Sequence, residues 1–349
     1  MKIYKNVFEN IISLENLFSS WDKFKSNKQK KRDVQLFEWK LEENIFKLHR
    51  DLKCRRYKHG DYMSFYVHDP KQRHIHKATV RDRVLHHAVF AILNPIFEST
   101  FISNSFSCRI NKGTHKGIDI LDKTIRQISS NYFKPCLALK CDIKRFFETI
   151  DHRILLNIIG KRIKDGNAMW LLREIIGSFS SKCSTPFGQK GLPIGNLTSQ
   201  LFANIYLNEF DQFIKHRLRV KNYLRYTDDF IILSRDRAYL RNLLEPISSF
   251  LLDNLALRLH PHKISIRKYH QGVDFLGYVV LPHYRLLRLK TRKRAFKKLE
   301  ERVKEYRAGI ISEQTLEQSL QSYLGVFSHA NTYKLEQELK NQFWFWFSG

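Results

Sequence analysis

Residues 223–234 read YLRYTDDFIILS, two strand-like runs that meet at Thr227, Asp228 and Asp229. This pattern predicts a β-hairpin with two acids at its tip. Adjacent carboxylates repel each other at a tight turn, and a purely structural hairpin would favour Asn-Gly or Asp-Gly there. We therefore expect a cation to lie against Asp228 and Asp229.

A third acid stands at the end of another apolar run. Residues 137–147 read LALKCDIKRFF and predict a strand that delivers Asp142 near its end. Clusters of carboxylate oxygens hold Mg²⁺ rather than zinc. Two such ions about 3.5–4 Å apart can activate a 3′-hydroxyl and stabilise a leaving pyrophosphate. An Asp-Asp pair alone would more simply be a surface turn, but the apolar flanks on both sides favour the metal site.

The charge balance of the chain is strongly basic. Lysine and arginine exceed aspartate and glutamate by 61 − 34 = 27 residues, which indicates a polyanionic partner such as nucleic acid or a membrane surface. No stretch approaches the roughly 20 uninterrupted apolar residues of a spanning helix, and the N-terminal residues alternate polar with apolar positions. We therefore expect an intracellular, cytoplasmic protein without a membrane segment.

Length and composition favour a folded protein of several units. The 349 residues are enough for two or three compact units, and the 43% apolar content can build real cores. The five cysteines show neither paired nor zinc-finger spacing, so reduced thiols are expected. They are Cys54, Cys108, Cys136, Cys141 and Cys183.

Hydrophobic periodicity places the other elements. Residues 1–60 are predicted to be helical, followed by a basic, strand-like stretch at 62–77 and a helix from about Arg81. Another helix should begin at the plausible N-cap Asp151, and a further one should span 197–216. The basic run Lys28–Arg32 is as consistent with a solvated loop as with an RNA contact.

Several motifs, taken in order, resemble the palm of reverse transcriptases. They are LKCDIKRFF (139–147), GLPIGNLTSQLFANIYL (191–207), RYTDDFIIL (225–233), LHPHKI (259–264) and FLGY (275–278). Upstream, residues 73–88 resemble the fingers motif of the same enzymes, and residues 104–115 resemble the block that follows it. The tetrad departs from the commoner YADD or YMDD by a threonine at position 227. The resemblance is close over roughly residues 60–285 and implies an α/β right-hand polymerase.

The resemblance implies roles for individual residues at the acid cluster. Asp142, Asp228 and Asp229 match the catalytic carboxylates that bind two Mg²⁺ ions, with Mn²⁺ as a substitute, and Ile143 would add a backbone carbonyl. Phe147 matches the steric gate, whose ring excludes a 2′-hydroxyl by a clash. The bland alternative is an ordinary core aromatic, which we expect of its neighbour Phe146.

Three cations match positions around the incoming nucleotide. Arg73 and Arg83 match fingers residues that contact the triphosphate, where a guanidinium suits bidentate phosphate binding. Lys263 would assist the pyrophosphate leaving group, although a solvated lysine is the commoner outcome.

One segment departs from most members of the family. Ile194, Gly195 and Gln200 stand where the commoner motif is Gln-Gly-x-x-x-Ser-Pro, and all three would line the nucleotide site. An apolar first position with glutamine last resembles the enzymes of diversity-generating retroelements, which misincorporate opposite template adenines. The alternative is an accurate enzyme of antiviral-defence or retron type that copies an associated non-coding RNA. The retroelement resemblance implies a small, basic, oligomeric accessory variability protein as partner, and a bacterial or phage-encoded locus.

Residues 290–308 predict a helix with an apolar stripe and a basic start. The cations Arg292, Lys293, Lys297 and Lys298 would lie beside the phosphates of an RNA/DNA duplex, although any one of them could be a solvated surface residue. Further helices around 316–324 and 333–339 complete a bundle, with Gly309 and Gly325 as helix stops. The aromatic residues 343–347 are expected to pack back on this bundle rather than to face a partner.

Together these features predict four regions and one reaction. We expect an N-terminal helical region (1–60), fingers (61–136), a palm (137–285, with part of the fingers interleaved) and a helical thumb (286–349). The expected reaction is RNA-templated addition of deoxynucleotides (dNTPs), guided by a structured template RNA. A catalytically idle RNA-binding protein is disfavoured by the intact acids, and an RNA-dependent RNA polymerase by Phe147.

Overall fold

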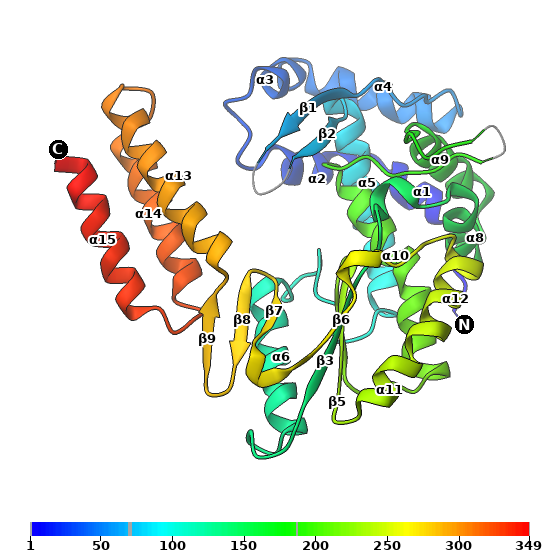
Figure 1. Ribbon diagram of the computed structural model, residues 1–349. Coiled ribbons are helices and arrows are strands. Elements are labelled where there is room, and N and C mark those ends of the chain that lie inside the picture. The colour runs from blue at the N-terminus through cyan, green and yellow to red at the C-terminus, as the bar shows by residue number, and fades with distance from the viewer. Residues whose placement is uncertain (1, 69–71, 186–187, 349) are drawn as a thin grey trace.

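The computed structural model describes residues 2–68, 72–185 and 188–348. In Figure 1 a central sheet lies between two groups of helices, and three C-terminal helices project on their own at one side. Within the described ranges we find no helical segment with the length and hydrophobicity that a bilayer crossing requires.

The central sheet is antiparallel and carries the acids. Its strand order is β4 (Tyr223–Tyr226), β5 (Asp229–Ser234), β3 (Leu137–Asp142) and β6 (Ser265–Lys268). The hairpin predicted around Thr227 is therefore confirmed, with β4 and β5 as its two arms.

Both faces of this sheet are buried, each in a separate core. Leu139 and Ile232 face the core shared with the N-terminal helices and α10 (Leu197–Gln212). Ala138 and Ile231 face the second core, which contains α6 (Thr114–Ile128) and the thumb helices. Because side chains alternate along a strand, a sheet covered on both faces needs nearly continuous apolar runs. This explains why residues 137–141 and 230–233 are so hydrophobic.

The N-terminal region is helical, as predicted. It comprises α1 (Val7–Ile12), α2 (Leu14–Lys25), α3 (Arg32–Trp39) and α4 (Leu41–Lys53). Helix α2 packs along the long helix α5 (Val80–Glu98), which begins where Thr79 accepts a hydrogen bond from the Asp82 amide.

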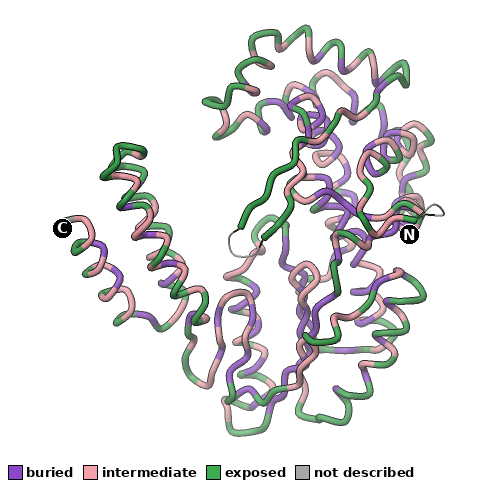
Figure 2. The backbone as a smooth tube through the Cα atoms, turned by 45° about the horizontal axis from the view of Figure 1, so that its top comes forward, coloured by how far each residue is buried: buried purple, intermediate pink, exposed green. Residues whose placement is uncertain are grey.

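The basic stretch at 62–77 forms a separate hairpin of β1 (Met63–Val67) and β2 (Arg73–Lys77). Figure 2 shows this hairpin projecting from the buried interior, with β1 exposed along its whole length.

Five further helices add to the core on the Leu139 face of the central sheet. They are α7 (Phe146–Thr149), α8 (His152–Arg162), α9 (Gly166–Gly177), α11 (Arg237–Asn242) and α12 (Leu244–Leu255), with a π-helical turn at Phe213–Arg217 and short 3₁₀ turns at Pro261–Lys263 and Tyr269–Gln271. Asp151 caps α8 by accepting hydrogen bonds from the amides of Arg153 and Ile154, as predicted.

A small sheet connects the palm to the thumb. The strands β7 (Val273–Phe275), β8 (Tyr278–Leu281) and β9 (Tyr284–Leu287) lead into α13 (Leu289–Arg307), α14 (Glu313–Phe327) and α15 (Tyr333–Ser348). Helix α13 packs against both α14 and α15, so the apolar stripe predicted on it serves two neighbours.

One of the two predicted helix stops is wrong. Gly309 follows the end of α13 with φ +69°, a left-handed conformation that glycine adopts without strain. Gly325, in contrast, lies inside α14, which continues to the fully buried Phe327. Burial of Phe327 provides the stabilisation that carries the helix past this glycine.

The aromatic C-terminus packs back on the thumb only in part. Phe343 is buried and the Phe347 ring stacks on Tyr306, with 5.6 Å between their centroids. Trp344 and Phe345 are exposed, although the Trp344 ring still meets the rings of Phe343 and Phe347 edge-on.

Candidate active site

The three predicted acids meet at one end of the central sheet. Asp142, the last residue of β3, lies directly opposite Asp229, the first residue of β5. Asp228 lies in the turn between β4 and β5, and its carbonyl accepts a hydrogen bond from the Ile143 amide at 3.2 Å. Two antiparallel pairings therefore bring together residues that are more than 80 positions apart in the sequence.

The acids share an unfavourable electrostatic environment. Burial, with the neighbouring Asp142 as the next cause, raises the pKa of Asp228 to about 6. Burial also raises the pKa of Asp229, an effect that the ammonium of Lys140 partly opposes. Carboxylates that are costly to ionise in this way are better accommodated when a cation is bound between them.

A lysine side chain already supplies one positive charge to the acid cluster. The Lys263 ammonium lies 2.8 Å from Asp142 Oδ2. Lys263 is the last residue of the 3₁₀ turn Pro261–Lys263. Among the residues that the structure describes, no group of three or more His, Cys, Asp or Glu side chains is arranged to coordinate a metal ion as it stands. The acids nevertheless provide only oxygen donors, which suits Mg²⁺, and Asp142 would need to turn from Lys263 toward the metal.

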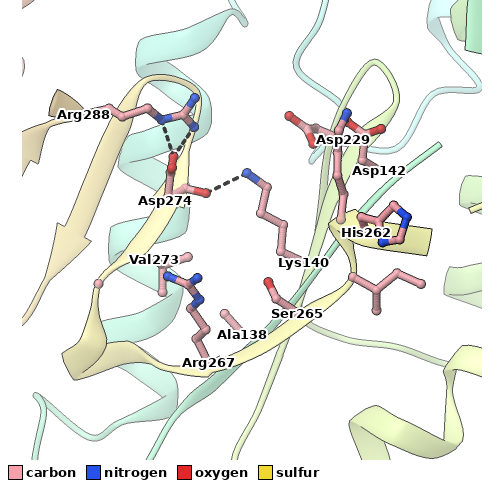
Figure 3. Close-up of a pocket in the computed structure, with 13 residues that line it drawn as sticks. Ala138, Lys140, Asp142, Asp229, His262, Ser265, Arg267, Val273, Asp274 and Arg288 are labelled. Carbon is pink, nitrogen blue, oxygen red and sulfur yellow. Dashed lines mark hydrogen bonds and ion pairs between the residues drawn. The ribbon is translucent and has the colours of Figure 1, made fainter. Parts of the chain in front are cut away.

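A pocket of about 350 Å³ opens beside Asp142 and Asp229. Figure 3 shows Lys140 reaching toward Asp274, whose carbonyl accepts from the Lys140 ammonium at 2.9 Å and whose carboxylate accepts from Arg288 at 2.7 Å. Further cations on the rim are Lys263 and Arg267. The pocket is therefore lined by four cations, Lys140, Lys263, Arg267 and Arg288, together with the acids Asp142, Asp229 and Asp274, so positive charge suited to a phosphorylated ligand lies beside the carboxylates.

The predicted gate residue lies next to the strand that carries Asp142. Phe147 is half-buried, whereas its neighbour Phe146 belongs to the core, as predicted. The Phe147 carbonyl accepts a hydrogen bond from the Leu192 amide at 2.7 Å. This bond ties Phe147 to the loop that carries Ile194.

That loop supports the fingers hairpin. The Ile194 carbonyl accepts a hydrogen bond from the His76 amide, so β2 is anchored on the loop. Gly195 has φ +115°, and a Cβ there would meet Ile75 Cγ2 at 2.9 Å, so this position requires glycine. Gln200 lies exposed on the first turn of α10. The three residues thus have different local roles.

The two predicted triphosphate contacts lie in different surroundings. Arg73 is exposed on β2 and points to the same face as Ile75, since residues two apart share a face of a strand. Arg83 is largely buried, pairs with Asp33 at 2.8 Å and covers the ring of Phe24. Within the described residues Arg73 forms no ion pair, whereas Arg83 would have to leave Asp33 and Phe24 before it could contact a nucleotide.

Among the four predicted duplex contacts on α13, ion pairs within the protein are described for two. Arg292 pairs with Glu338 of α15, and Lys298 pairs with Glu301 on its own helix. Lys293 and Lys297 are exposed on the same helix.

Sequence reasoning missed the buried ion pair behind the acids. Arg225 and Asp211 are both fully buried and form two hydrogen bonds, at 2.7 and 2.6 Å. The available signal was an arginine inside an apolar strand, because a buried guanidinium must have an anionic partner.

Comparison with known proteins places this fold and site in a polymerase class. Residues 66–280, more than half of the chain, match the family described as reverse transcriptase (RNA-dependent DNA polymerase). The protein therefore belongs to the reverse transcriptase family.

Relatives in several organisms agree with this assignment. Protein YkfC of Escherichia coli K12 is 26% identical over 61% of this chain and 62% of its own length. The group II intron-encoded protein LtrA of Lactococcus lactis is 25% identical over 68% of this chain and 49% of its own. The putative COX1/OXI3 intron 2 protein of Saccharomyces cerevisiae is 23% identical over 57% of this chain and 29% of its own. The chain thus spans less than two thirds of each of these relatives.

A solved structure supports the predicted fold. The telomerase of Candida albicans, determined in complex with a fragment of telomeric RNA, superimposes with a TM-score of 0.52. The match covers 90% of this chain and 59% of the telomerase chain at 13% identity. Together with the family match, this confirms the right-hand polymerase architecture of fingers, palm and thumb.

Proposed function

We propose that this protein is an RNA-directed DNA polymerase that extends a primer with deoxynucleotides on an RNA template. The observation that carries the proposal is the meeting of Asp142, Asp228 and Asp229 beside a pocket whose lining includes four cations. The carboxylates and the Ile143 carbonyl would hold two Mg²⁺ ions, with Mn²⁺ as a substitute. When bound, these ions activate the primer hydroxyl and stabilise the pyrophosphate.

The surrounding residues would divide the remaining tasks. Arg73 would bind the triphosphate, Lys263 would meet the leaving pyrophosphate, and the half-buried ring of Phe147 would exclude a 2′-hydroxyl. The exposed cations Lys293 and Lys297 would contact the duplex backbone. These roles come from the family resemblance and agree with the positions of the side chains.

The test is primer extension on an RNA template with the double variant Asp228→Ala/Asp229→Ala. We expect no DNA product but nearly unchanged RNA binding, because the cations that bind RNA lie elsewhere. Asp253→Ala, which removes an exposed carboxylate from α12, is the matched control and should extend normally. Full-length product from the double variant would refute the site.

We further propose that the template is the repeat RNA of a diversity-generating retroelement and that copying is error-prone. Support comes from Ile194 and Gln200, which resemble those enzymes. The structure places Ile194 in the loop that anchors β2, so a change there could alter how the fingers hold a nucleotide. The partners would then be structured RNA and a basic accessory variability protein, in the cytoplasm of a bacterium. Sequencing cDNA made from an adenine-containing RNA separates this proposal from an accurate defence or retron-type enzyme.

A further inference from the structure

The residue before the two catalytic acids has a strained backbone. Thr227 has φ +53°, in the left-handed region. Threonine is β-branched, and such residues rarely adopt this conformation because the side chain crowds the backbone. A strained residue of this kind persists only where its surroundings hold it in place.

Two hydrogen bonds hold Thr227. Its hydroxyl donates to Ser107 Oγ at 2.6 Å, and its carbonyl accepts from Arg225 Nη1 at 3.1 Å. Ser107 is itself buried, and its carbonyl accepts a hydrogen bond from Asn204 Nδ2 at 2.9 Å. The hydroxyl and the carbonyl of Thr227 are therefore both hydrogen-bonded to buried side chains.

The arginine is fixed from several directions. Both carboxylate oxygens of Asp211 accept from Arg225, and the Tyr223 hydroxyl donates to the same carboxylate at 2.7 Å. The main chain of Arg225 pairs with Asn104 and Phe106. Because a guanidinium is a planar, rigid fork, binding Asp211 with Nε and Nη2 directs the remaining Nη1 toward the turn. Burying such a pair is costly in itself, which suggests that its position matters.

We propose that Ser107, Asp211 and Arg225 are positioning residues that hold Thr227 in its left-handed conformation and thereby set the carboxylates of the catalytic turn. The inference rests on the proposed function, since carboxylate placement matters only if these acids hold metal ions. Alanine or methionine, the commoner residues at this position in the family, could not make the hydroxyl contact with Ser107. The contact with Ser107 therefore depends on the threonine that this chain carries at position 227.

The test removes one hydroxyl at a time. Thr227→Val keeps the shape and the β-branching but loses the bond to Ser107, Ser107→Ala removes the acceptor, and Thr227→Ser retains a hydroxyl. Two quantities are measured: Mn²⁺ affinity by electron paramagnetic resonance, and the Mg²⁺ concentration for half-maximal primer extension.

We expect Thr227→Val and Ser107→Ala each to weaken Mn²⁺ binding and to raise the Mg²⁺ requirement by about two- to tenfold, the usual effect of one buried neutral hydrogen bond. The double variant should bind Mn²⁺ no more weakly than the weaker-binding single variant, because both substitutions remove the same hydrogen bond. Thr227→Ser should keep most of the wild-type Mn²⁺ affinity, because it retains the hydroxyl. Affinity for template RNA should not change.

Thr124→Val is the matched control, since its hydroxyl donates within α6, to the Ile120 carbonyl at 2.6 Å. It should leave metal affinity unchanged. If Thr227→Val lowers thermal stability without changing Mn²⁺ affinity, the network is merely structural and the proposal is wrong. Wild-type protein that binds no Mn²⁺ would also overturn it. Wild-type protein that binds Mn²⁺ but makes no DNA would refute the proposed function alone, because Mn²⁺ affinity still tests the positioning role.

Discussion

The ammonium of Lys263 forms an ion pair with the carboxylate of Asp142, 2.8 Å from Oδ2, at the edge of the acid cluster. In the proposed reaction Asp142 would also hold a metal ion, which would weaken its contact with Lys263. Lys263 would then compensate the charge of the acids before a metal binds and would compete with the metal for Asp142.

Replacing Lys263 with methionine should lower the melting temperature in metal-free buffer and enlarge the rise produced by Mg²⁺. The loss should be about 1 kcal/mol or less, because the lysine side chain is 41% exposed and its ion pair is screened by water. The Mg²⁺ effect should grow because bound metal stabilises the folded state and no longer displaces an ammonium. Thermal melts with and without Mg²⁺ measure the melting temperature of the metal-free protein and the rise that Mg²⁺ produces. Lys161→Met, which breaks a similar exposed pair with Glu209, should leave the Mg²⁺ effect unchanged; an unchanged effect in Lys263→Met as well would contradict the competition.

Asp228→Asn should stabilise the metal-free protein at neutral pH. The pKa of Asp228 is raised to about 6 in the folded protein, whereas in the unfolded chain it lies near 3.9. The folded state then binds the proton more tightly, so ionising this carboxylate reduces stability as the pH rises from about 4 to 6, and the cost is constant above that range. The gain in Asp228→Asn should be on the order of 1–3 kcal/mol at pH 7.5 and small at pH 4. Melts in a chelator across this pH range test it, and an equal gain at all pH values would contradict it.

Trimming Phe147 to valine or alanine should admit ribonucleotides. The ring is half-buried on α7, five positions after Asp142, where the family resemblance implies a side chain that clashes with a 2′-hydroxyl, and selection by a clash disappears when the clashing group is removed. We expect the preference for deoxynucleotides to fall by about ten- to a hundredfold. Extension with each nucleotide type alone measures this. Phe146→Leu, a change in the core, should cost stability but keep the preference; an unchanged preference in the Phe147 variants would mean that this ring, too, only fills space.

The hairpin and its acids were predictable because local patterns determine them: two apolar runs, a tight turn and a third apolar strand ending in Asp142. The network behind them was not predicted: Arg225 inside an apolar strand indicates a buried anionic partner, but the sequence does not show that this partner is Asp211, and Ser107 bonds to Thr227 across 120 positions. Arg83 illustrates the same limit, since its partner Asp33 lies in a helix 50 positions away. Gly325 was misread for a related reason, as burial of Phe327 outweighs the low helix propensity of glycine.

Ile194→Gln should make copying more accurate, most visibly opposite template adenines. Glutamine at the matching position in accurate reverse transcriptases can hydrogen-bond near the incoming nucleotide and favour the geometry of a correct pair. Isoleucine has no donor or acceptor, so a misaligned nucleotide leaves no buried polar group unpaired at this position.

The side chain of Ile194 is half-buried, while its carbonyl accepts the His76 amide of β2. The substitution keeps this backbone contact, so it changes the polarity of the site without releasing the fingers hairpin. A contact of this kind is worth about 1–3 kcal/mol, or roughly tenfold to a hundredfold in discrimination if it acts mainly in the transition state.

Sequencing cDNA from both enzymes on one adenine-containing template measures the effect. Gln200→Ala, which changes the exposed glutamine of the same motif, is the companion variant. If it alters errors as much as Ile194→Gln does, the effect belongs to the motif as a whole. Identical error spectra for wild type and Ile194→Gln would locate any infidelity elsewhere in the fingers or in the accessory partner, and the retroelement proposal would lose its mechanistic support.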